Sequence, residues 1–228
     1  MTIATNIKTV KDRIAAAAKR AGRDPLAIKL IVVTKTVDIG RIGEAVAAGA
    51  AVLGENRVQE AKEKIEMLGP VARWDLIGHL QTNKAKYAVK LFDLIHSVDT
   101  LELAKELDKQ AAKIGKKQNV LIEVNIAGEA SKAGMAIKNT PLLVREAAKL
   151  KGIAIQGLMT VPPYSENPED SRPYFSKLRD LAKSIAKENI PNLSMNELSM
   201  GMSGDFEVAI EEGATMVRVG TAIFGARQ

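Results

Sequence analysis

Short apolar runs alternate with helical apolar patterns along the whole chain, and this alternation constrains the fold more than any other feature. The apolar runs that predict buried strands lie at about 29–34, 51–53, 74–77, 92–97, 120–125, 153–159, 193–198 and 216–219. Apolar residues at helical spacing occupy most of the segments between these runs. Because strands that alternate with helices form parallel sheets, the sequence predicts an α/β protein.

Eight such strands predict a single (β/α)8 TIM barrel over residues 1–228. An extra N-terminal helix precedes the first strand, since Ile3, Ile7 and Val10 recur at helical spacing. A doubly wound open sheet gives the same local pattern and is the alternative. The barrel is favoured because eight units fit the length of 228 residues, and because no Gly-x-Gly-x-x-Gly follows the first strand.

Local signals predict how two of the helices begin. Asp99 and Glu102 resemble a capping box after the fourth strand, and Thr140-Pro141 predicts a cap followed by a first helical position. Two polar stretches, 127–139 and 162–171, follow the fifth and sixth strands. Each is either a mobile lid over the barrel mouth or a surface excursion.

The composition narrows the class of protein. The chain has no Cys and only two His, which excludes a disulfide framework and argues against a Cys- or His-ligated metal. The N-terminal residues contain no apolar segment of the signal-peptide type, and no apolar run approaches the roughly 18 residues of a membrane helix. We therefore expect a cytoplasmic protein with no membrane partner.

The net charge of +6 is compatible with a polyanionic partner such as nucleic acid. However, the basic residues are spread along the predicted helices among 27 acidic residues. The densest cluster, Lys113, Lys116 and Lys117, lies at a helix end, where cations suit the helix dipole. We expect a solvated surface and no nucleic-acid partner, although the same field would attract a small ligand that carries a phosphate.

Two basic residues stand out at the carboxyl ends of predicted strands, where barrels of this kind carry their chemistry. Lys35 ends the first apolar run, and Arg218 lies in the last one. Strand alternation puts Lys35 on the face of Ile31 and Arg218 on the face of Met216. If these faces line the barrel, two cationic side chains point into one small space.

Two cations in such a space need an anionic partner. One solution is pairing with Glu55, Glu123 or Asp75, and the other is a bound phosphate ester. Segments 199–204 and 220–221 offer hydroxyls and backbone amides after the last two strands, where barrels hold phosphate. Burial beside an arginine favours the neutral, nucleophilic form of a lysine amine, which captures aldehydes. An aldehyde that carries a phosphate is, most simply, pyridoxal 5′-phosphate (PLP).

Six motifs at the ends of the predicted strands carry a family resemblance. They are Val-Thr-Lys-Thr at 33–36, Gly-Glu-Asn-Arg-Val-Gln-Glu at 54–60, and the segments 77–84, 157–159, 198–203 and 217–225. Together they resemble the YggS-like (PROSC) family of pyridoxal phosphate homeostasis proteins, from about residue 4 to residue 227. The resemblance implies an alanine-racemase-like barrel of the third fold type among PLP proteins.

The resemblance also implies roles for individual residues. Lys35 would be the Schiff-base lysine, Arg218 would lie at the pyridine nitrogen, and Ser203, Gly220 and Thr221 would surround the phosphate. The remaining expected contacts lie in the motifs at the barrel mouth. The full set of expected cofactor-binding residues is Lys35, Asn56, His79, Met200, Ser203, Arg218, Gly220 and Thr221, and no catalytic or metal-binding residue is expected.

The family function implied is intracellular vitamin B6 homeostasis: a monomeric carrier that holds PLP and helps to supply it to PLP-dependent apo-enzymes, without catalysis. The alternative is a PLP-dependent amino-acid racemase, which needs acid–base groups on both faces of the ring. Related racemases take the second group from a β domain after the barrel, which we do not expect here. Tyr87, Tyr164 and Tyr174 are the possible substitutes, and we expect each to pack or to lie at the surface.

Overall fold

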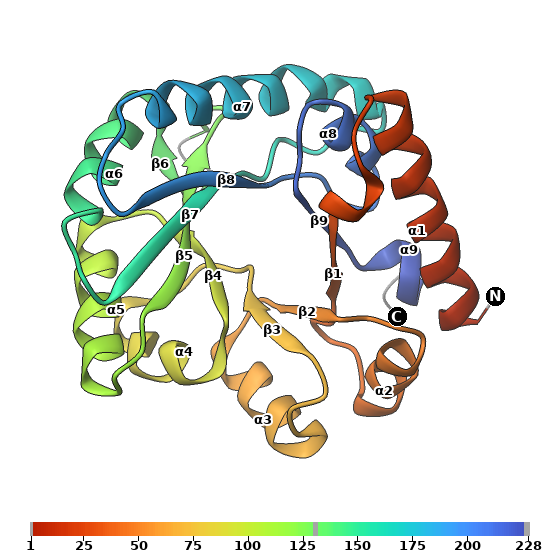
Figure 1. Ribbon diagram of the computed structural model, residues 1–228. Helices are drawn as coiled ribbons and strands as arrows, with labels where there is room; N and C mark the ends of the chain where they lie inside the picture. Colours follow the sequence, from red (N-terminus) through yellow and green to blue (C-terminus); the bar gives the residue numbers. More distant parts are fainter. Residues whose placement is uncertain (1, 130–131, 226–228) are drawn as a thin grey trace.

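Eight parallel strands form a closed barrel inside a ring of helices, as the computed structural model shows for residues 2–129 and 132–225 (Figure 1). The barrel strands are β1 (Lys29–Val33), β2 (Val52–Glu55), β3 (Arg73–Leu76), β4 (Leu94–Val98), β5 (Gln118–Asn125), β7 (Ile153–Met159), β8 (Leu193–Ser199) and β9 (Met216–Val219). Pairing of β1 with β9 and of β4 with β5 closes the ring. The barrel prediction is therefore confirmed, and the doubly wound open sheet is excluded.

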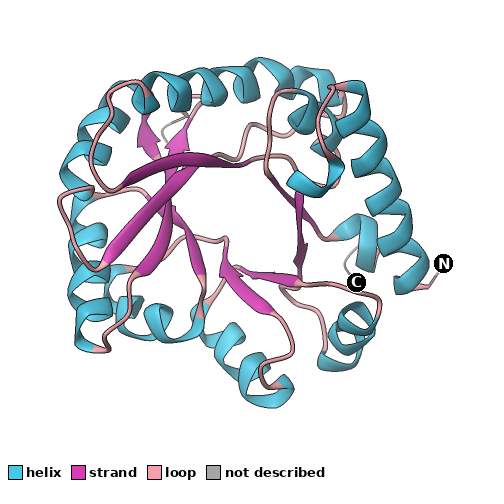
Figure 2. Ribbon diagram, in the orientation of Figure 1, coloured by secondary structure: helices cyan, strands magenta, loops and turns pink. Residues whose placement is uncertain are grey.

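The helices lie outside the barrel, and Figure 2 shows them surrounding the strands. They are α1 (Ile3–Arg20), α2 (Ile39–Ala47), α3 (Val58–Leu68), α4 (Ala85–Leu91), α5 (Leu101–Lys113), α6 (Thr140–Ala147), α7 (Arg172–Ala186), α8 (Phe206–Glu211) and α9 (Thr221–Phe224). The predicted extra helix, α1, packs against α8 and α9. Asn6 Nδ2 donates to the Ile223 carbonyl at 2.8 Å, which ties the first helix to the last. Across the described residues, no helix is long and apolar enough to span a bilayer.

The apolar core has two parts. The larger part fills the space between the strands and the helices. The smaller part occupies the barrel lumen and consists of Ile31, Leu94, Leu121, Met159 and Met216. Because Ile31 and Met216 belong to the lumen, the inward faces of β1 and β9 are those that strand alternation assigned, and Arg218 points inward from β9.

Two predicted element ends were wrong by one or two residues. The helix α5 is capped by Thr100, whose Oγ1 accepts from the Leu103 amide at 3.2 Å, and not by Asp99. Thr100 has the extended backbone of a cap, so the helix starts one residue later than the pattern of acidic residues indicated. Strand β1 ends at Val33, which places Lys35 in the turn after the strand.

The start of α6 is only partly as predicted. Pro141 does lie in the first turn, but Thr140 is already helical and its hydroxyl donates to the Ala136 carbonyl at 3.1 Å. The helix therefore has no side-chain cap at this end.

The two polar stretches contain local structure that the sequence did not predict. Stretch 127–139 includes a two-residue strand, β6 (Met135–Ala136), which pairs with β5, while residues 130 and 131 lie outside the described part. Stretch 162–171 ends in a short 3-10 helix, Pro168–Ser171. The Ser171 hydroxyl donates to Asp205 Oδ2 at 3.0 Å, which fastens this stretch to the loop before α8.

Close packing between two strands requires Gly157, the glycine of the motif at 157–159. A β-carbon at this position would lie 1.8 Å from the Glu197 carbonyl oxygen on the neighbouring strand. The strand register shifts on both sides of this point, between β5 and β7 and between β7 and β8. Only a residue without a side chain lets β7 and β8 approach so closely.

One residue of the basic cluster at the end of α5, Lys116, has a structural role. Lys116 Nζ donates to the carbonyls of Val89 and Phe92, at 2.8 and 2.7 Å. These carbonyls belong to the carboxyl end of α4, where a cation is favoured. Lys116 therefore helps to join the end of α4 to the segment after α5, a structural use that a polyanion site does not need.

Candidate functional site

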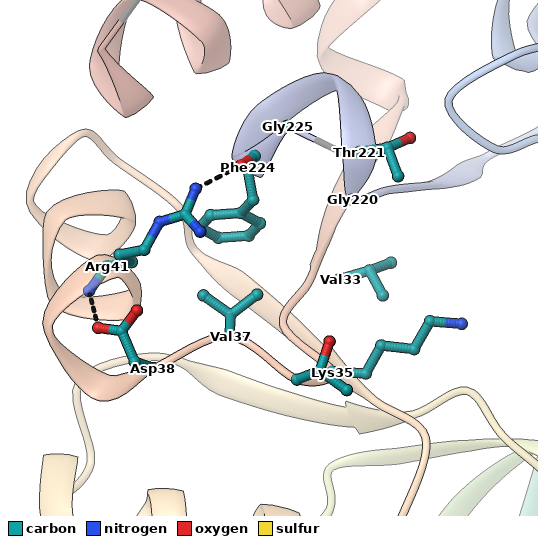
Figure 3. A pocket seen from close by; sticks show the side chains of 10 residues that line it. Val33, Lys35, Val37, Asp38, Arg41, Gly220, Thr221, Phe224 and Gly225 are labelled. Atoms are coloured by element: carbon teal, nitrogen blue, oxygen red, sulfur yellow. Dashed lines mark hydrogen bonds between the residues drawn. The ribbon is translucent and has the colours of Figure 1, made fainter. Parts of the chain in front are cut away.

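Two cavities meet at the carboxyl end of β1. The first, which we call the mouth cavity, has a volume of about 390 Å³. The second, the side cavity, has a volume of about 600 Å³ and is lined by Val37, Asp38, Arg41 and Phe224 (Figure 3). Lys35 lines both of them, as do Val33, Gly220 and Thr221. The expected site residues that line the mouth cavity are Lys35, Asn56, Ser203, Arg218, Gly220 and Thr221.

Lys35 is half-buried and lies between the two cavities. Figure 3 shows its side chain extended past Val33, with the ammonium on the side away from Asp38 and Arg41. The residue after it, Thr36, has a φ of 62°, a left-handed conformation that is uncommon for a branched side chain. The sharp turn that this conformation produces directs the chain from β1 to α2 while the lysine faces the barrel mouth.

A buried lysine stabilises the turn that contains Lys35. Lys64 lies on α3, and its side chain is only 9% exposed. Its ammonium donates to the Thr34 carbonyl at 2.7 Å, to Glu55 Oε1 at 2.7 Å and to Glu60 Oε1 at 2.6 Å. The same Glu55 oxygen accepts from the Thr34 hydroxyl at 2.6 Å. The first residue of the turn is thereby bonded through both its backbone and its side chain.

The last residue of the turn is held by the same group of charges. The Thr36 amide donates to Glu60 Oε1 at 2.6 Å, so the residues on both sides of Lys35 are bonded to the Lys64 cluster. Sequence reasoning missed this cluster because Glu60 and Lys64 are four residues apart on a helix, which is the spacing of an ordinary surface pair. Nothing in that spacing shows that Lys64 is buried.

Arg218 is almost fully buried, with 4% of its surface exposed. Its guanidinium donates to the Ser199 hydroxyl at 2.5 Å and to the Thr160 carbonyl at 2.9 Å. Burial lowers the pKa of Arg218 to about 10, and the nearby Glu123 and Asp205 oppose that effect. The guanidinium is therefore still a cation at neutral pH. Both of these hydrogen bonds go to neutral acceptors, so the geometry favours a bound ligand over a carboxylate pair for this residue.

The start of α9 presents converging backbone donors. The amides of Gly220 and Ala222 point at the Ser203 hydroxyl oxygen, at 3.3 and 3.4 Å. A β-carbon on Gly220 would lie 3.2 Å from the Val33 β-carbon, so a glycine keeps this approach open. Two amides and a hydroxyl at one point are the kind of donor set that binds an anion.

His79 and Met200, also expected at the site, do not line the mouth cavity. The His79 side chain is 58% exposed, and its Nδ1 lies 3.8 Å from Asp99 Oδ2. Met200 is fully buried in the core outside the barrel, because Ser199 takes the inward position on β8 and the next residue must face outward. Any contact of Met200 with a ligand in the mouth cavity would have to involve its backbone.

Several polar residues occupy the barrel lumen: Asp75 and Glu123, which the sequence offered as possible partners of the two cations, Ser199 from the predicted phosphate segment, and His96, which had no predicted role. Asp75, His96, Ser199 and Glu123 all occupy inward positions on their strands, and each is less than 9% exposed. Burial raises the pKa of Glu123 to about 7; Asp99 adds to this effect and Arg218 opposes it. Strand alternation could have placed His96 in the lumen, since it follows the lumen residue Leu94 by two positions.

Replacing Glu123 with glutamine should stabilise the protein at high pH. Glu123 keeps its proton in the fold up to a pKa of about 7, against an ordinary value of 4.5, so its contribution to stability is lost as the pH rises through 7. A neutral isostere removes that loss, which amounts to up to about 3 kcal/mol. Urea unfolding should therefore show the Glu123→Gln variant more stable than the wild type at pH 8 and nearly equal at pH 4.

The exposed Glu102 provides a matched control, because Glu102→Gln removes the same charge from the surface of α5. This variant should differ little from the wild type at either pH. A Glu123→Gln difference of the same size at pH 4 and pH 8 would contradict the assignment of a raised pKa.

Comparison with known proteins shows the family. Residues 5–228 match the family model described as alanine racemase, N-terminal domain. The pyridoxal phosphate homeostasis protein of Aquifex aeolicus is 48% identical over 229 residues, covering all of both chains. That of Pseudomonas aeruginosa is 41% identical and covers 99% of this chain and 96% of its own.

Solved structures agree with this relationship. PipY of Synechococcus elongatus with PLP bound is 35% identical, with a TM-score of 0.86 and coverage of 98% of this chain and all of the other. A protein of Bifidobacterium adolescentis described as unknown is 39% identical, with a TM-score of 0.92, covering 97% and 94% of the two chains. An alanine racemase of Clostridium difficile is 17% identical with a TM-score of 0.72; it shares the fold, and this chain covers 57% of it. The chain therefore belongs to the family of pyridoxal phosphate homeostasis proteins.

Proposed function

We propose that this protein binds PLP in the mouth cavity, holds it covalently on Lys35, and helps to supply it to other enzymes in the cytoplasm as part of vitamin B6 homeostasis. One observation carries the proposal: a single cavity is lined by an amine, a buried guanidinium and a set of converging backbone donors. The relatives named for pyridoxal phosphate homeostasis, and the PLP-bound PipY structure, support it.

The residues present fit the chemical groups of PLP. The cofactor supplies an aldehyde, which a lysine amine captures. Ser203 and the amides of Gly220 and Ala222 would hold the phosphate, with the Thr221 hydroxyl beside them. The cavity volume of about 390 Å³ lies within the range of roughly 300–1,000 Å³ that small-molecule sites have.

Arg218 would determine the protonation state of the pyridine nitrogen of PLP. A guanidinium can only donate hydrogen bonds, so it suits a pyridine nitrogen that carries no proton. An unprotonated ring withdraws electrons less strongly than one that faces a carboxylate. Such a site stabilises negative charge on a bound amino acid less strongly than a site with a carboxylate at that position.

Amino-acid racemisation is the second candidate function, because Tyr164 lines the mouth cavity and is 88% exposed. Tyr87 and Tyr174 do not line it. Incubation of the PLP-loaded protein with D- and L-alanine in deuterated water distinguishes the two candidates. We expect no rapid, saturable exchange at Cα; exchange that disappears in a Tyr164→Phe variant would establish a racemase-type reaction and contradict the carrier.

A PLP-transfer assay tests whether the protein supplies the cofactor to other enzymes. The PLP-loaded protein is mixed with a PLP-dependent apo-enzyme, and the return of activity is compared with that produced by the same concentration of free PLP in the presence of a PLP scavenger. The carrier predicts that reactivation persists when the scavenger removes free PLP. Loss of reactivation under these conditions would limit the role to storage.

A further inference from the structure

A row of buried polar side chains crosses the barrel lumen and ends at Arg218. Arg73 Nε donates to Asp75 Oδ1 at 2.9 Å, and Asp75 Oδ2 lies 3.1 Å from His96 Nε2. His96 Nδ1 lies 2.9 Å from the Ser199 hydroxyl oxygen, which accepts from Arg218 at 2.5 Å. His96 and Ser199 are fully buried, and Asp75 is 1% exposed.

The chemistry of the two ends fixes the direction of every bond in this row. Arg218 can only donate, so the Ser199 oxygen accepts from it and is left with one O–H to give. Among the described residues, the other hydrogen-bond partner of the Ser199 hydroxyl is Arg218 itself, so that O–H goes to His96 Nδ1. His96 Nδ1 is therefore the acceptor nitrogen, and Nε2 carries the proton that is donated to Asp75.

The neutral state of His96 agrees with this direction. Burial lowers the pKa of His96; Asp75 opposes that shift, while Arg218 and Arg73 add to it. A neutral imidazole has one donor and one acceptor nitrogen, which is what the row requires. The row thus runs without interruption from the guanidinium that lines the mouth cavity to the Asp75 carboxylate on β3.

Such a row needs a reason, because the lumen also holds a cluster of five buried apolar side chains, which offer it no hydrogen bonds. Burial of polar groups is costly unless every group has a partner, and a hydrogen-bonded chain of this kind holds its members in one arrangement. Only one end of the row, Arg218, lines the mouth cavity. The arrangement therefore acts on Arg218, the member of the row that a ligand in this cavity can contact.

We propose that Asp75, His96 and Ser199 are positioning residues, which hold the Arg218 guanidinium in the orientation and charge state that a ring nitrogen in the mouth cavity meets. The proposal rests on the proposed function, since the ring is that of PLP. Asp75 acts at the far end: its negative charge makes His96 Nδ1 a better acceptor, and this in turn strengthens the hold of Ser199 on Arg218.

The first experiment needs no cofactor. His79 and His96 are the only histidines in the sequence, so nitrogen-15 labelling of histidine gives two ring systems, and a His79→Gln variant assigns them. We expect the His96 ring in the cofactor-free protein to be neutral with its proton on Nε2. A proton on Nδ1, or a charged ring at neutral pH, would overturn the proposed direction of the row.

The second experiment compares three serine variants after loading with PLP. Ser199→Ala breaks the row, Ser199→Thr keeps a hydroxyl at the same place, and Ser97→Ala removes a hydroxyl that is equally buried on β4 but has no partner in the described structure. We expect Ser199→Ala to weaken PLP binding about 10-fold, the usual effect of one hydrogen bond to a charged group. It should also shift the pH dependence of the visible spectrum of bound PLP.

Ser199→Thr should largely restore both properties, and Ser97→Ala should match the wild type. If Ser199→Ala behaves like Ser97→Ala, or changes affinity without changing the spectrum, the positioning role is wrong, because a merely structural residue accounts for either result. A wild-type protein that binds no PLP would instead overturn the proposed function, and with it the claim that the row positions Arg218 for the ring nitrogen. The nitrogen-15 result is independent of that failure.

Discussion

A Lys35→Ala variant is expected to lose the visible absorption band of the PLP-loaded protein completely. The amine at position 35 is the group that would bond to the cofactor aldehyde, and alanine has no nucleophile to replace it. Non-covalent binding should survive in part, because Arg218 and the amides at the start of α9 stay in place. Absorption spectra during a PLP titration, with bound PLP measured separately by dialysis, would separate the covalent link from binding.

Lys132 provides the control for this prediction. It lies in the loop after β5, with its side chain 31% exposed, and it is the next candidate amine from the sequence. Lys132→Ala should keep the visible band. A band that persists in Lys35→Ala and disappears in Lys132→Ala would move the covalent site to that loop.

A Lys64→Met substitution is expected to destabilise the fold and to slow the covalent attachment of PLP. The substitution keeps the length of the side chain but removes the ammonium that bonds Thr34, Glu55 and Glu60. Glu55 is fully buried, and removal of the partner of a buried charge typically costs about 3–5 kcal/mol. Urea unfolding should show a loss of this size, and the covalent link to PLP should form more slowly because the turn around Lys35 has lost its support.

The loss of stability in Lys64→Met should depend on pH, because it depends on the protonation of Glu55. Burial raises the pKa of Glu55, and the hydrogen bonds from Lys64 and Thr34 act in the opposite direction. Without Lys64 the pKa rises further, so the carboxyl stays protonated at low pH and stability falls as the pH rises. The deficit of Lys64→Met should therefore be larger at pH 8 than at pH 5.

Lys62→Met is the matched control, because Lys62 lies on the same helix, is 56% exposed and contacts Glu66 at 3.6 Å. A surface pair of this kind contributes at most about 1 kcal/mol. If Lys62→Met and Lys64→Met cost the same, the buried cluster does not have the role assigned to it.

The barrel could be predicted from the sequence because its signals are local. Each strand is a short apolar run and each helix has its own apolar face, so the count of eight units needed no knowledge of contacts. Lys35 and Arg218 stood out because strand alternation is also local, and the lumen positions of Ile31 and Met216 confirm the assigned faces. The family motifs then pointed to the barrel mouth.

Contacts between distant segments could not be predicted in the same way. The bond between His96 and Ser199 joins residues 103 positions apart, and it depends on how strands on opposite sides of the barrel are aligned. The burial of Lys64 depends on how closely α3 approaches the turn after β1. The cap of α5 was placed wrongly for a different reason: Asp99 and Thr100 are both good caps, and the backbone conformation of Thr100 decides between them.

Chemical trapping of the bound cofactor tests the central claim most directly. Borohydride reduction of the PLP-loaded wild-type protein makes a lysine link permanent, and tryptic digestion followed by mass spectrometry then locates it. We predict that the reduced cofactor is found on the peptide 30–41, uncleaved at Lys35. A label on another lysine, or no label on a protein shown to have bound PLP, would contradict the account.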